Sequence, residues 1–255
     1  MVIDLEPLAG GRRAEQVFER LRARILSGEL GAGERLPNER ELALALGVNR
    51  ASVREAVKRL EFLELVDVVH GQGTFVRALE GSSSLQLIEW LLRDPRTVTP
   101  SLMRQLLSFR RDVTLRVVEL AALHRNEVQL ERARALLARE QADGADPARA
   151  LAIDLEWNRL LGEATGNLMY QLLSNLFTKL VAQLGPLYYN RERDWRRSHE
   201  THAEMLAAIE AGDASAARDV LGRMLGYSDE AILAFVERLS AEGRIGPAAA
   251  AGGRA

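Results

Sequence analysis

The chain has 255 residues, of which 47% are hydrophobic and 27% charged, so its length and composition allow two packed domains. It contains no cysteine, which excludes disulfides, thiolate metal sites and cysteine nucleophiles and is typical of a reducing compartment. The net charge of −2 leaves a nucleic-acid partner open, because affinity for an anion then depends on the local arrangement of charge. No apolar run approaches the roughly 20 residues that span a bilayer, and residues 1–11 lack the apolar core of a signal peptide. We therefore expect a cytoplasmic protein.

Three helices and a β-hairpin are predicted for residues 1–77. Apolar residues recur at helical spacing over residues 13–27, 39–46 and 50–63. Asn49 offers a side-chain oxygen as the N-cap of the third helix. Residues 65–69 and 74–77 are rich in β-forming side chains and flank a glycine-rich turn, which is typical of a hairpin. This order of elements predicts a winged helix-turn-helix.

The rest of the chain shows helical patterns only. Residues 81–84 are polar, which predicts a linker at residues 78–84, and residues 85–240 predict an all-helical bundle of about six or seven helices. Thr99-Pro100 and Asp146-Pro147 each place an N-cap before a proline at the first helical position. Residues 241–255 are rich in small residues without apolar periodicity, so we expect a disordered tail. The predicted fold class is mainly α.

The third helix carries residues suited to reading DNA. Its first turns place Arg50 and Arg54 four residues apart on the polar face, and arginine is the usual bidentate reader of guanine. Asn49 and Ser52 are candidates for a phosphate or base contact, and Arg40 in the preceding helix is placed to meet the DNA backbone. The alternative for an isolated group of arginines is a solvated helix face. Two residues of the turn between the strands are candidates for the wing contact: His70 and Gly71.

Residues 28–59 resemble the GntR-type family of transcription regulators. The resemblance consists of Gly-x-Leu-x-x-Gly-x-x-Leu-Pro-x-Glu-Arg-x-Leu at residues 28–42, Leu-Gly-Val-x-Arg-x-x-Val-Arg-Glu-Ala at residues 46–56, and a His-Gly pair in the wing. In that family, the positions that match the candidates above contact operator DNA. The resemblance thus implies DNA contacts for Arg40, Asn49, Arg50, Ser52, Arg54, His70 and Gly71.

The helical domain is similar to the effector-binding domain of the FadR subfamily of these regulators. Residues 85–111, with Leu-Leu-Ser-x-Arg at 106–110, and residues 154–167 resemble the fatty-acid-responsive members. The resemblance implies a repressor of fatty-acid metabolism that releases DNA on binding long-chain acyl-coenzyme A. A buried anion must be paired, which makes Arg110 and Arg223 candidate ligand residues, and the resemblance adds Gly226 and Tyr227. The chain lacks the serine and tryptophan that follow the matching glycine in that pattern.

A metal site is the next feature that the subfamily suggests. Its metal-binding members use an Asp, a His four residues later and two further His, and the matching positions hold Asp154, Asn158, His202 and Met224. His199 lies three residues before His202 and is a possible further ligand. Because two imidazoles are replaced, we expect no tightly bound metal and no cofactor, with Asp154, His199 and His202 as vestigial candidates.

Other readings of the chain remain open at this stage. No catalytic motif of a hydrolase, metalloprotease or nucleotide-binding enzyme is present, so we expect no enzyme. The helical domain could serve dimerisation without a ligand, or could sense a small carboxylate such as a sugar acid or dicarboxylate, with or without a metal. We expect a homodimer that binds double-stranded operator DNA, because twofold symmetry matches two half-sites.

Overall fold

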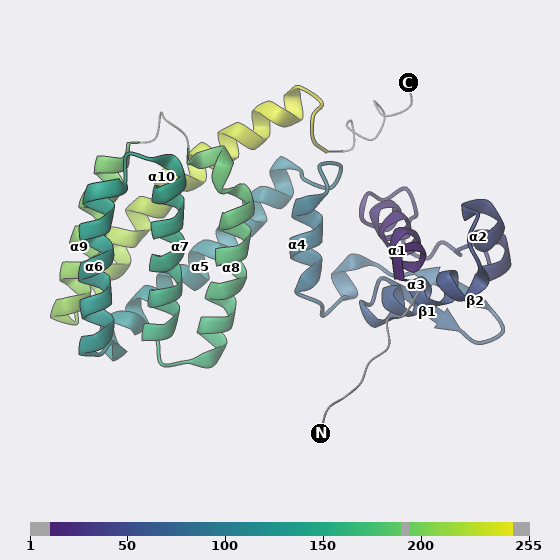
Figure 1. Cartoon of the computed structure of the whole chain (residues 1–255), viewed down its shortest axis with the longest axis horizontal. Coiled ribbons are helices and arrows are strands. Elements are labelled where there is room, and N and C mark those ends of the chain that lie inside the picture. Colours follow the sequence, from purple (N-terminus) through teal and green to yellow (C-terminus); the bar gives the residue numbers. More distant parts are fainter. Residues whose placement is uncertain (1–10, 190–193, 247–255) are drawn as a thin grey trace. The chain divides into compact units, whose positions relative to one another are not determined.

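A computed structural model describes residues 11–189 and 194–246 and divides them into two compact units. The first unit runs to Val98 and also includes Ile245, and the second spans Thr99–Arg244. Figure 1 shows all elements in chain order. We describe each unit by itself.

The first unit begins with the predicted three helices. They are α1 (Gly11–Leu26), α2 (Glu39–Leu46) and α3 (Arg50–Phe62). Asn38 caps α2 in a capping box, and the Asn49 side chain accepts a hydrogen bond from the Ser52 backbone as the N-cap of α3. Buried apolar side chains of all three helices, among them Phe18, Val53 and Leu60, form one core. The helix-turn-helix prediction is therefore confirmed.

The wing is an antiparallel hairpin with a third segment along its edge. Strand β1 (Val66–Val69) pairs with β2 (Gly73–Val76) in the register Val66 to Val76 and Val69 to Gly73. The backbone of residues 33–36 hydrogen-bonds to β2, and Arg35 bridges to Phe75. The segment that precedes α2 thus lies on the free edge of β2 and fixes the wing to the helix-turn-helix.

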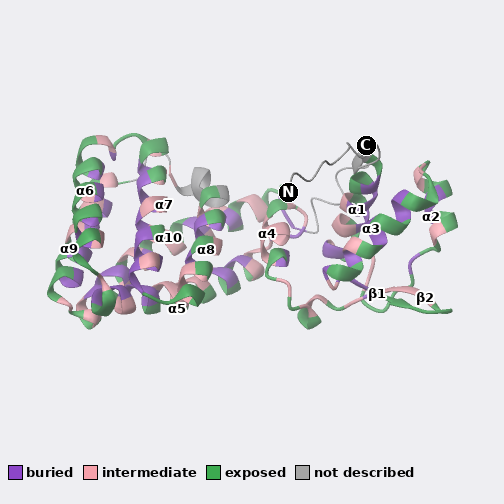
Figure 2. Cartoon of the chain, turned by 60° about the horizontal axis from the view of Figure 1, so that its bottom comes forward, coloured by how far each residue is buried: buried purple, intermediate pink, exposed green. Residues whose placement is uncertain are grey.

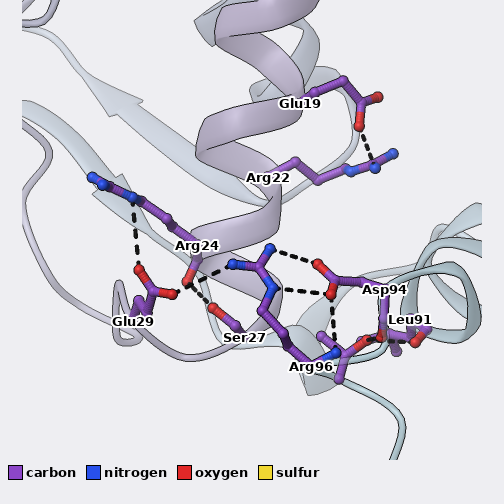
Figure 3. Close-up of polar contacts among 9 residues, drawn as sticks. Glu19, Arg22, Arg24, Ser27, Glu29, Leu91, Asp94 and Arg96 are labelled. Atoms are coloured by element: carbon purple, nitrogen blue, oxygen red, sulfur yellow. Dashed lines mark hydrogen bonds and ion pairs between the residues drawn. The ribbon is translucent and has the colours of Figure 1, made fainter. Parts of the chain in front are cut away.

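Helix α4 (Gln86–Arg93), which follows the short 3₁₀ turn η1 (Leu79–Gly81), lies in the first unit. The sequence analysis assigned residues 85–98 to the helical domain, and the structure differs because Leu87 is buried in the first core. The rings of Trp90 and Phe18 meet edge to face, with their centroids 5.9 Å apart. Figure 3 shows the polar contacts beside this helix. There Arg96 binds Asp94 through Nη2 at 2.7 Å and lies 3.5 Å from Glu29.

The second unit is a bundle of six helices within the described residues. They are α5 (Pro100–His124), α6 (Glu127–Asp143), α7 (Pro147–Ala164), α8 (Leu168–Tyr188), α9 (Trp195–Ala211) and α10 (Ala214–Ala241). Helices α9, α6, α7 and α8 lie side by side in that order, and α5 and α10 pack together across them. Thr99 and Asp146 cap α5 and α7 before a proline, as predicted. Buried residues face the interior between the helices, and exposed ones line the outer faces (Figure 2).

The end of the chain differs in part from the expected tail. Helix α10 continues to Ala241, Ile245 is buried, and the Gly246 N–H donates to the Pro95 carbonyl at 2.7 Å. Residues 241–246 of the expected tail thus have a described structure that includes a buried isoleucine. Residues 247–255 of the expected tail lie outside the described residues. None of the described helices has the length and apolar character to cross a membrane.

Candidate nucleic-acid interface and effector cavity

The two arginines at the start of α3 are exposed and converge on one carboxylate. Arg50 and Arg54 have side chains that are 62% and 57% exposed. Arg54 donates from Nε and Nη2 to the two carboxylate oxygens of Glu39, at 3.1 and 3.0 Å, and Arg50 Nη2 lies 3.7 Å from the same group. The Arg54 hydrogen bond is the largest cause that holds the pKa of Glu39 below its usual range. The carboxylate is therefore ionised at neutral pH beside the proposed DNA-reading side chains.

The other helix-turn-helix candidates differ in exposure. Arg40 lies on α2 with an exposed side chain that forms no ion pair within the described part of the chain. Asn49 is exposed, and its side-chain oxygen is occupied by the capping bond, so its amide group is the part that can face DNA. Ser52 is only 8% exposed because the first turn of α3 packs against the core. The structure therefore corrects the prediction that the Ser52 side chain lies on the contact surface.

The wing tip carries one candidate that the sequence analysis missed. His70 and Gly71 lie in the exposed turn between the strands, where Gly71 has a φ of +75°, which favours glycine. Arg35 is exposed and lies over Gly73, where an added Cβ would be 2.7 Å from the Arg35 Nε. The edge pairing of residues 33–36 brings this cation next to the tip. Such pairing is not local in the sequence, so no periodicity could have indicated it.

A partly open cavity lies within the second unit. Residues of α5, α7, α8, α9 and α10 line it together with Tyr189. Its polar lining consists of Arg110, Thr114, Asp154, Asn158, Tyr189, Ser198, His202 and Ser228, among leucine, methionine and aromatic side chains. The space open to water-sized molecules is about 80 Å³. An apolar cavity with a few convergent polar groups is the usual form of a small-ligand site.

Arg110 supplies the positive charge of this cavity. Its Nη2 donates to Asp229 at 2.6 Å and lies 3.4 Å from the Ser228 hydroxyl, while its buried Nε finds no hydrogen-bond partner in the described structure. Burial raises the pKa of Asp229, and the adjacent Arg110 opposes this shift. Arg110 therefore faces the cavity and is also paired with an acid.

The other predicted ligand residues do not line the cavity. Arg223 is 62% exposed and pairs with Glu204 on the surface at 2.6 Å. Tyr227 is exposed beneath the Arg197 guanidinium, and Gly226 faces Arg111. The buried side of α10 is formed by Ala217, Val220, Leu221 and Leu225, which turns Arg223 outward. The structure therefore separates these three residues from Arg110.

The positions that match the metal-binding relatives do converge on the cavity. Asp154, Asn158, His202 and Met224 all line it. The Asn158 amide donates to the Asp154 backbone carbonyl at 3.0 Å, and the Tyr189 hydroxyl donates to the Asp154 carboxylate. Asp154 and His202 are thus the strong donors among these four, fewer than the three protein ligands of a typical open zinc site.

Glu140 is a buried acid that the sequence analysis missed. It is 2% exposed, and both of its oxygens lie within 3.0 Å of His202 Nδ1. Glu140, Asp154 and His202 each offer a ligand atom, and these atoms lie within 4.8 Å of one another. A carboxylate at Nδ1 orients a histidine ring, which is the usual arrangement behind a metal-bound imidazole. His199 Nδ1 lies 3.6 Å from the same acid and does not line the cavity.

Two family profiles match the chain. The profile described as "Bacterial regulatory proteins, gntR family" matches residues 13–76, and that of the FCD domain matches residues 105–226. The first covers the helix-turn-helix and the wing, and the second covers most of the bundle that holds the cavity.

Curated relatives give the same assignment. The transcriptional regulator Mce2R of Mycobacterium tuberculosis is 41% identical over 126 residues, which is 49% of this chain and 52% of that protein. The chain thus spans about half the length of the first relatives that it matches. The fatty acid metabolism regulator of Yersinia pestis is 31% identical over 65% of this chain and 68% of its own length. A protein of Escherichia coli named for regulation of an L-lactate dehydrogenase operon is 28% identical over 92% of both chains.

A solved structure supports the fold. The Listeria monocytogenes regulator Lar is similar with a TM-score of 0.55 at 16% identity, and the match covers 92% of this chain and all of that one. The motifs, the winged helix-turn-helix with its helical partner unit and the matched relatives agree. The chain belongs to the GntR family of bacterial transcription regulators, with a C-terminal FCD domain.

Proposed function

We propose that this regulator is a homodimer that binds operator DNA through α3 and the wing and releases it when a small carboxylate enters the cavity. The observation that carries the proposal is the Arg110 guanidinium, which faces the cavity and keeps a buried Nε–H without a partner in the described residues. A carboxylate that enters an apolar cavity needs such a donor, because an unpaired buried charge is costly.

The DNA half of the proposal rests on exposed groups around α3. Arg50 and Arg54 present guanidinium groups at the start of the helix that enters the major groove in this motif. Arg40 supplies a backbone contact, and His70 with Gly71 supplies the wing contact. Asn49 contributes its amide group.

The effector half favours a small acid over long-chain acyl-coenzyme A. The space of about 80 Å³ that is open to water-sized molecules favours a small acid over a long acyl chain, which needs a larger space. Arg223, Gly226 and Tyr227, which the resemblance to fatty-acid-responsive regulators suggested, lie outside the lining. The two relatives named for a lactate dehydrogenase operon and for fatty acid metabolism point in different directions, so the proposal rests on the cavity and its lining.

Release of DNA requires that the ligand prefer one arrangement of the dimer. A ligand shifts an equilibrium only by its differential affinity, and a hundredfold preference corresponds to about 2.7 kcal/mol. Two half-sites one helical turn apart then lose simultaneous contact with the two recognition helices. Sedimentation of the full chain with and without operator measures the stoichiometry, and the proposal requires two chains per operator.

Calorimetry with two ligand series tests the effector class. One series contains 2-hydroxy, 2-keto and dicarboxylic acids of two to six carbons, and the other contains acyl-coenzyme A of increasing chain length. We expect a small acid to bind and to release the operator duplex. The result that overturns this class is acyl-coenzyme A binding whose affinity rises by about 0.8 kcal/mol per methylene.

Matched arginine variants locate the site. Arg110→Gln leaves Asp229 buried beside a neutral side chain, so the pair Arg110→Gln/Asp229→Asn removes both charges together. Loss of a charged hydrogen bond predicts about 1.5–3 kcal/mol weaker acid binding in both variants. Arg223→Gln, a surface arginine, serves as the control and leaves acid binding unchanged.

A further inference from the structure

From the contacts at the start of α2 and α3, we infer that Glu39 is a specificity-determining residue for DNA binding, which positions Arg54 for a base and opposes its use on phosphates. The inference rests on the proposed function, in which Arg54 reads a base. It assigns a role to an acid that stands on the DNA-facing side among arginines.

A bidentate ion pair, which we call the fork, joins Glu39 of α2 to Arg54 of α3. Glu39 is the first residue of α2, and Arg54 lies 15 positions later on α3. The Arg54 Nε and Nη2 donate to separate oxygens of Glu39 at 3.1 and 3.0 Å, which is the bidentate arrangement of a guanidinium on a carboxylate. Arg50 Nη2 approaches the same carboxylate at 3.7 Å. One acid therefore restrains both arginines of the recognition helix.

The fork leaves the terminal N–H groups of Arg54 available for a base contact. A guanidinium has five N–H groups, and Glu39 engages the edge formed by Nε and Nη2. The opposite end, with Nη1 and the second proton of Nη2, still offers two parallel donors, which is what the O6 and N7 atoms of guanine accept. Holding the side chain in this position before binding reduces the rotamer entropy lost on contact.

The same carboxylate acts against contacts that carry no sequence information. A phosphate prefers the bidentate edge that Glu39 already occupies, and the negative charge of Glu39 repels the phosphate itself. On DNA without the correct base, Arg54 has only phosphates to bind, so Glu39 lowers the affinity there. On operator DNA, the base contact remains. Specificity is the ratio of the affinity for operator DNA to the affinity for other DNA. Glu39 raises this ratio because it preserves the base contact on the operator and weakens phosphate contacts elsewhere.

A purely structural role makes a different prediction. As a clamp between α2 and α3, the pair would be weak, because the Arg54 and Glu39 side chains are 57% and 32% exposed and exposed ion pairs contribute little stability. Leu42 and Val53 already join the two helices in the core. Loss of a clamp would lower the melting temperature and weaken operator and non-operator binding in parallel.

The test compares Glu39→Gln with Glu55→Gln in the full chain. Glu55 is exposed on α3 next to Arg54 and forms no ion pair in the described structure, so its substitution removes the same charge without the fork. Each variant is titrated with an operator selected from random duplexes by the unchanged chain and with a shuffled duplex, at several salt concentrations. We expect the ratio of operator to shuffled affinity to fall by about tenfold more in Glu39→Gln than in Glu55→Gln. The salt slope on shuffled DNA should steepen by about one.

Two further variants separate the possible causes. Glu39→Asp keeps the charge but shortens the reach, so we expect shuffled binding near that of the unchanged chain and a partial loss of the ratio. In an Arg54→Gln background, Glu39→Gln should change the ratio no more than Glu55→Gln does. Equal ratios for Glu39→Gln and Glu55→Gln overturn the inference while leaving the DNA proposal intact. Normal operator binding by Arg54→Gln overturns both.

Discussion

The exposed arginines of the first unit differ in what surrounds them, and this difference predicts different DNA roles. Arg54 is restrained by Glu39, whereas the Arg40 side chain has no ion pair in the described residues. A restrained guanidinium suits a base contact of defined direction, and an unrestrained one suits a phosphate contact.

Arg54→Ala should therefore weaken operator binding by about 1–3 kcal/mol with little effect on shuffled DNA. Arg40→Ala should weaken both duplexes alike and reduce the salt slope by about one, because a phosphate contact carries no sequence information. Fluorescence anisotropy at several salt concentrations measures both quantities. Lys58→Ala, an exposed cation two turns from the start of α3, is the control. If the two arginine variants showed the same profile, the division of roles would be wrong.

A second prediction concerns the metal positions in the cavity. An amide oxygen and a thioether are weak ligands for first-row metals, so the chain should bind such a metal weakly, and a chelator should leave its melting temperature unchanged. Asn158→His with Met224→His supplies two imidazoles next to Asp154 and His202 and should raise zinc or nickel affinity.

Titration of the chain and of this double variant with zinc and nickel, followed by calorimetry and by thermal unfolding, measures the change. His124→Asn in the unchanged chain serves as the control, because His124 is exposed at the end of α5 and does not line the cavity. Stoichiometric metal that leaves the unchanged chain only on unfolding would contradict this prediction.

Sequence reasoning located some of these residues and missed others for physical reasons. The inward position of Arg110 follows from the stripe of Met103, Leu106 and Leu107, all of which are buried. Glu140 continues the stripe of Leu130, Ala133 and Leu136, so a charged residue at an apolar position was the available signal. Its partner His202 lies 62 residues away, and single-sequence periodicity does not pair residues at that distance.

At the scale of elements, local signals predicted more than non-local ones. Helices α2 and α3 begin where the capping residues Asn38 and Asn49 indicate, because caps act within one turn of the chain. The third segment of the wing, residues 33–36, has no such signal, since it is created by hydrogen bonds to β2. The position of Arg35 beside the wing tip depends on this pairing.

Gly73→Ala should disturb the wing and its cation together. Gly73 has a φ of +123°, and an added Cβ would lie 2.7 Å from the Arg35 Nε. We expect a loss of stability of about 1–2 kcal/mol from the backbone strain and displacement of Arg35. DNA affinity should fall to the level of Arg35→Gln, and the double variant should show no further loss. Thermal unfolding and DNA titration measure the two effects. Additive losses in the double variant would show that the two residues act independently.

At the scale of the whole molecule, the division between units follows burial rather than the polar sequence that was expected to be a linker. Residues 81–84 are polar, which favoured a boundary at residues 78–84, but Leu87, Trp90 and Leu91 of α4 pack on the first core. An amphipathic helix can pack on either neighbour, and the sequence pattern does not show which one supplies the matching apolar surface.

A fragment of residues 1–98 should therefore be more stable than a fragment of residues 1–84. The shorter fragment loses the buried Leu87 and the Trp90 contact with Phe18, and burial of a leucine side chain alone contributes about 1.5–3 kcal/mol. For a domain of this size, a loss of about 2 kcal/mol lowers the melting temperature by roughly 8–16 °C. Both fragments lack Ile245, so the comparison isolates residues 85–98.

Below its melting temperature, the shorter fragment should still bind a half-site as tightly as the longer one, because α3 and the wing are present in both. Leu87→Ala in the full chain is the matched control and should lower the stability of the first unit by about 2–5 kcal/mol. Differential scanning calorimetry of the fragments and two-transition analysis of the full chain provide the measurements. Equal melting temperatures for the two fragments would place α4 outside the first cooperative unit, since a helix that contributes its buried leucine to a core cannot be removed without cost.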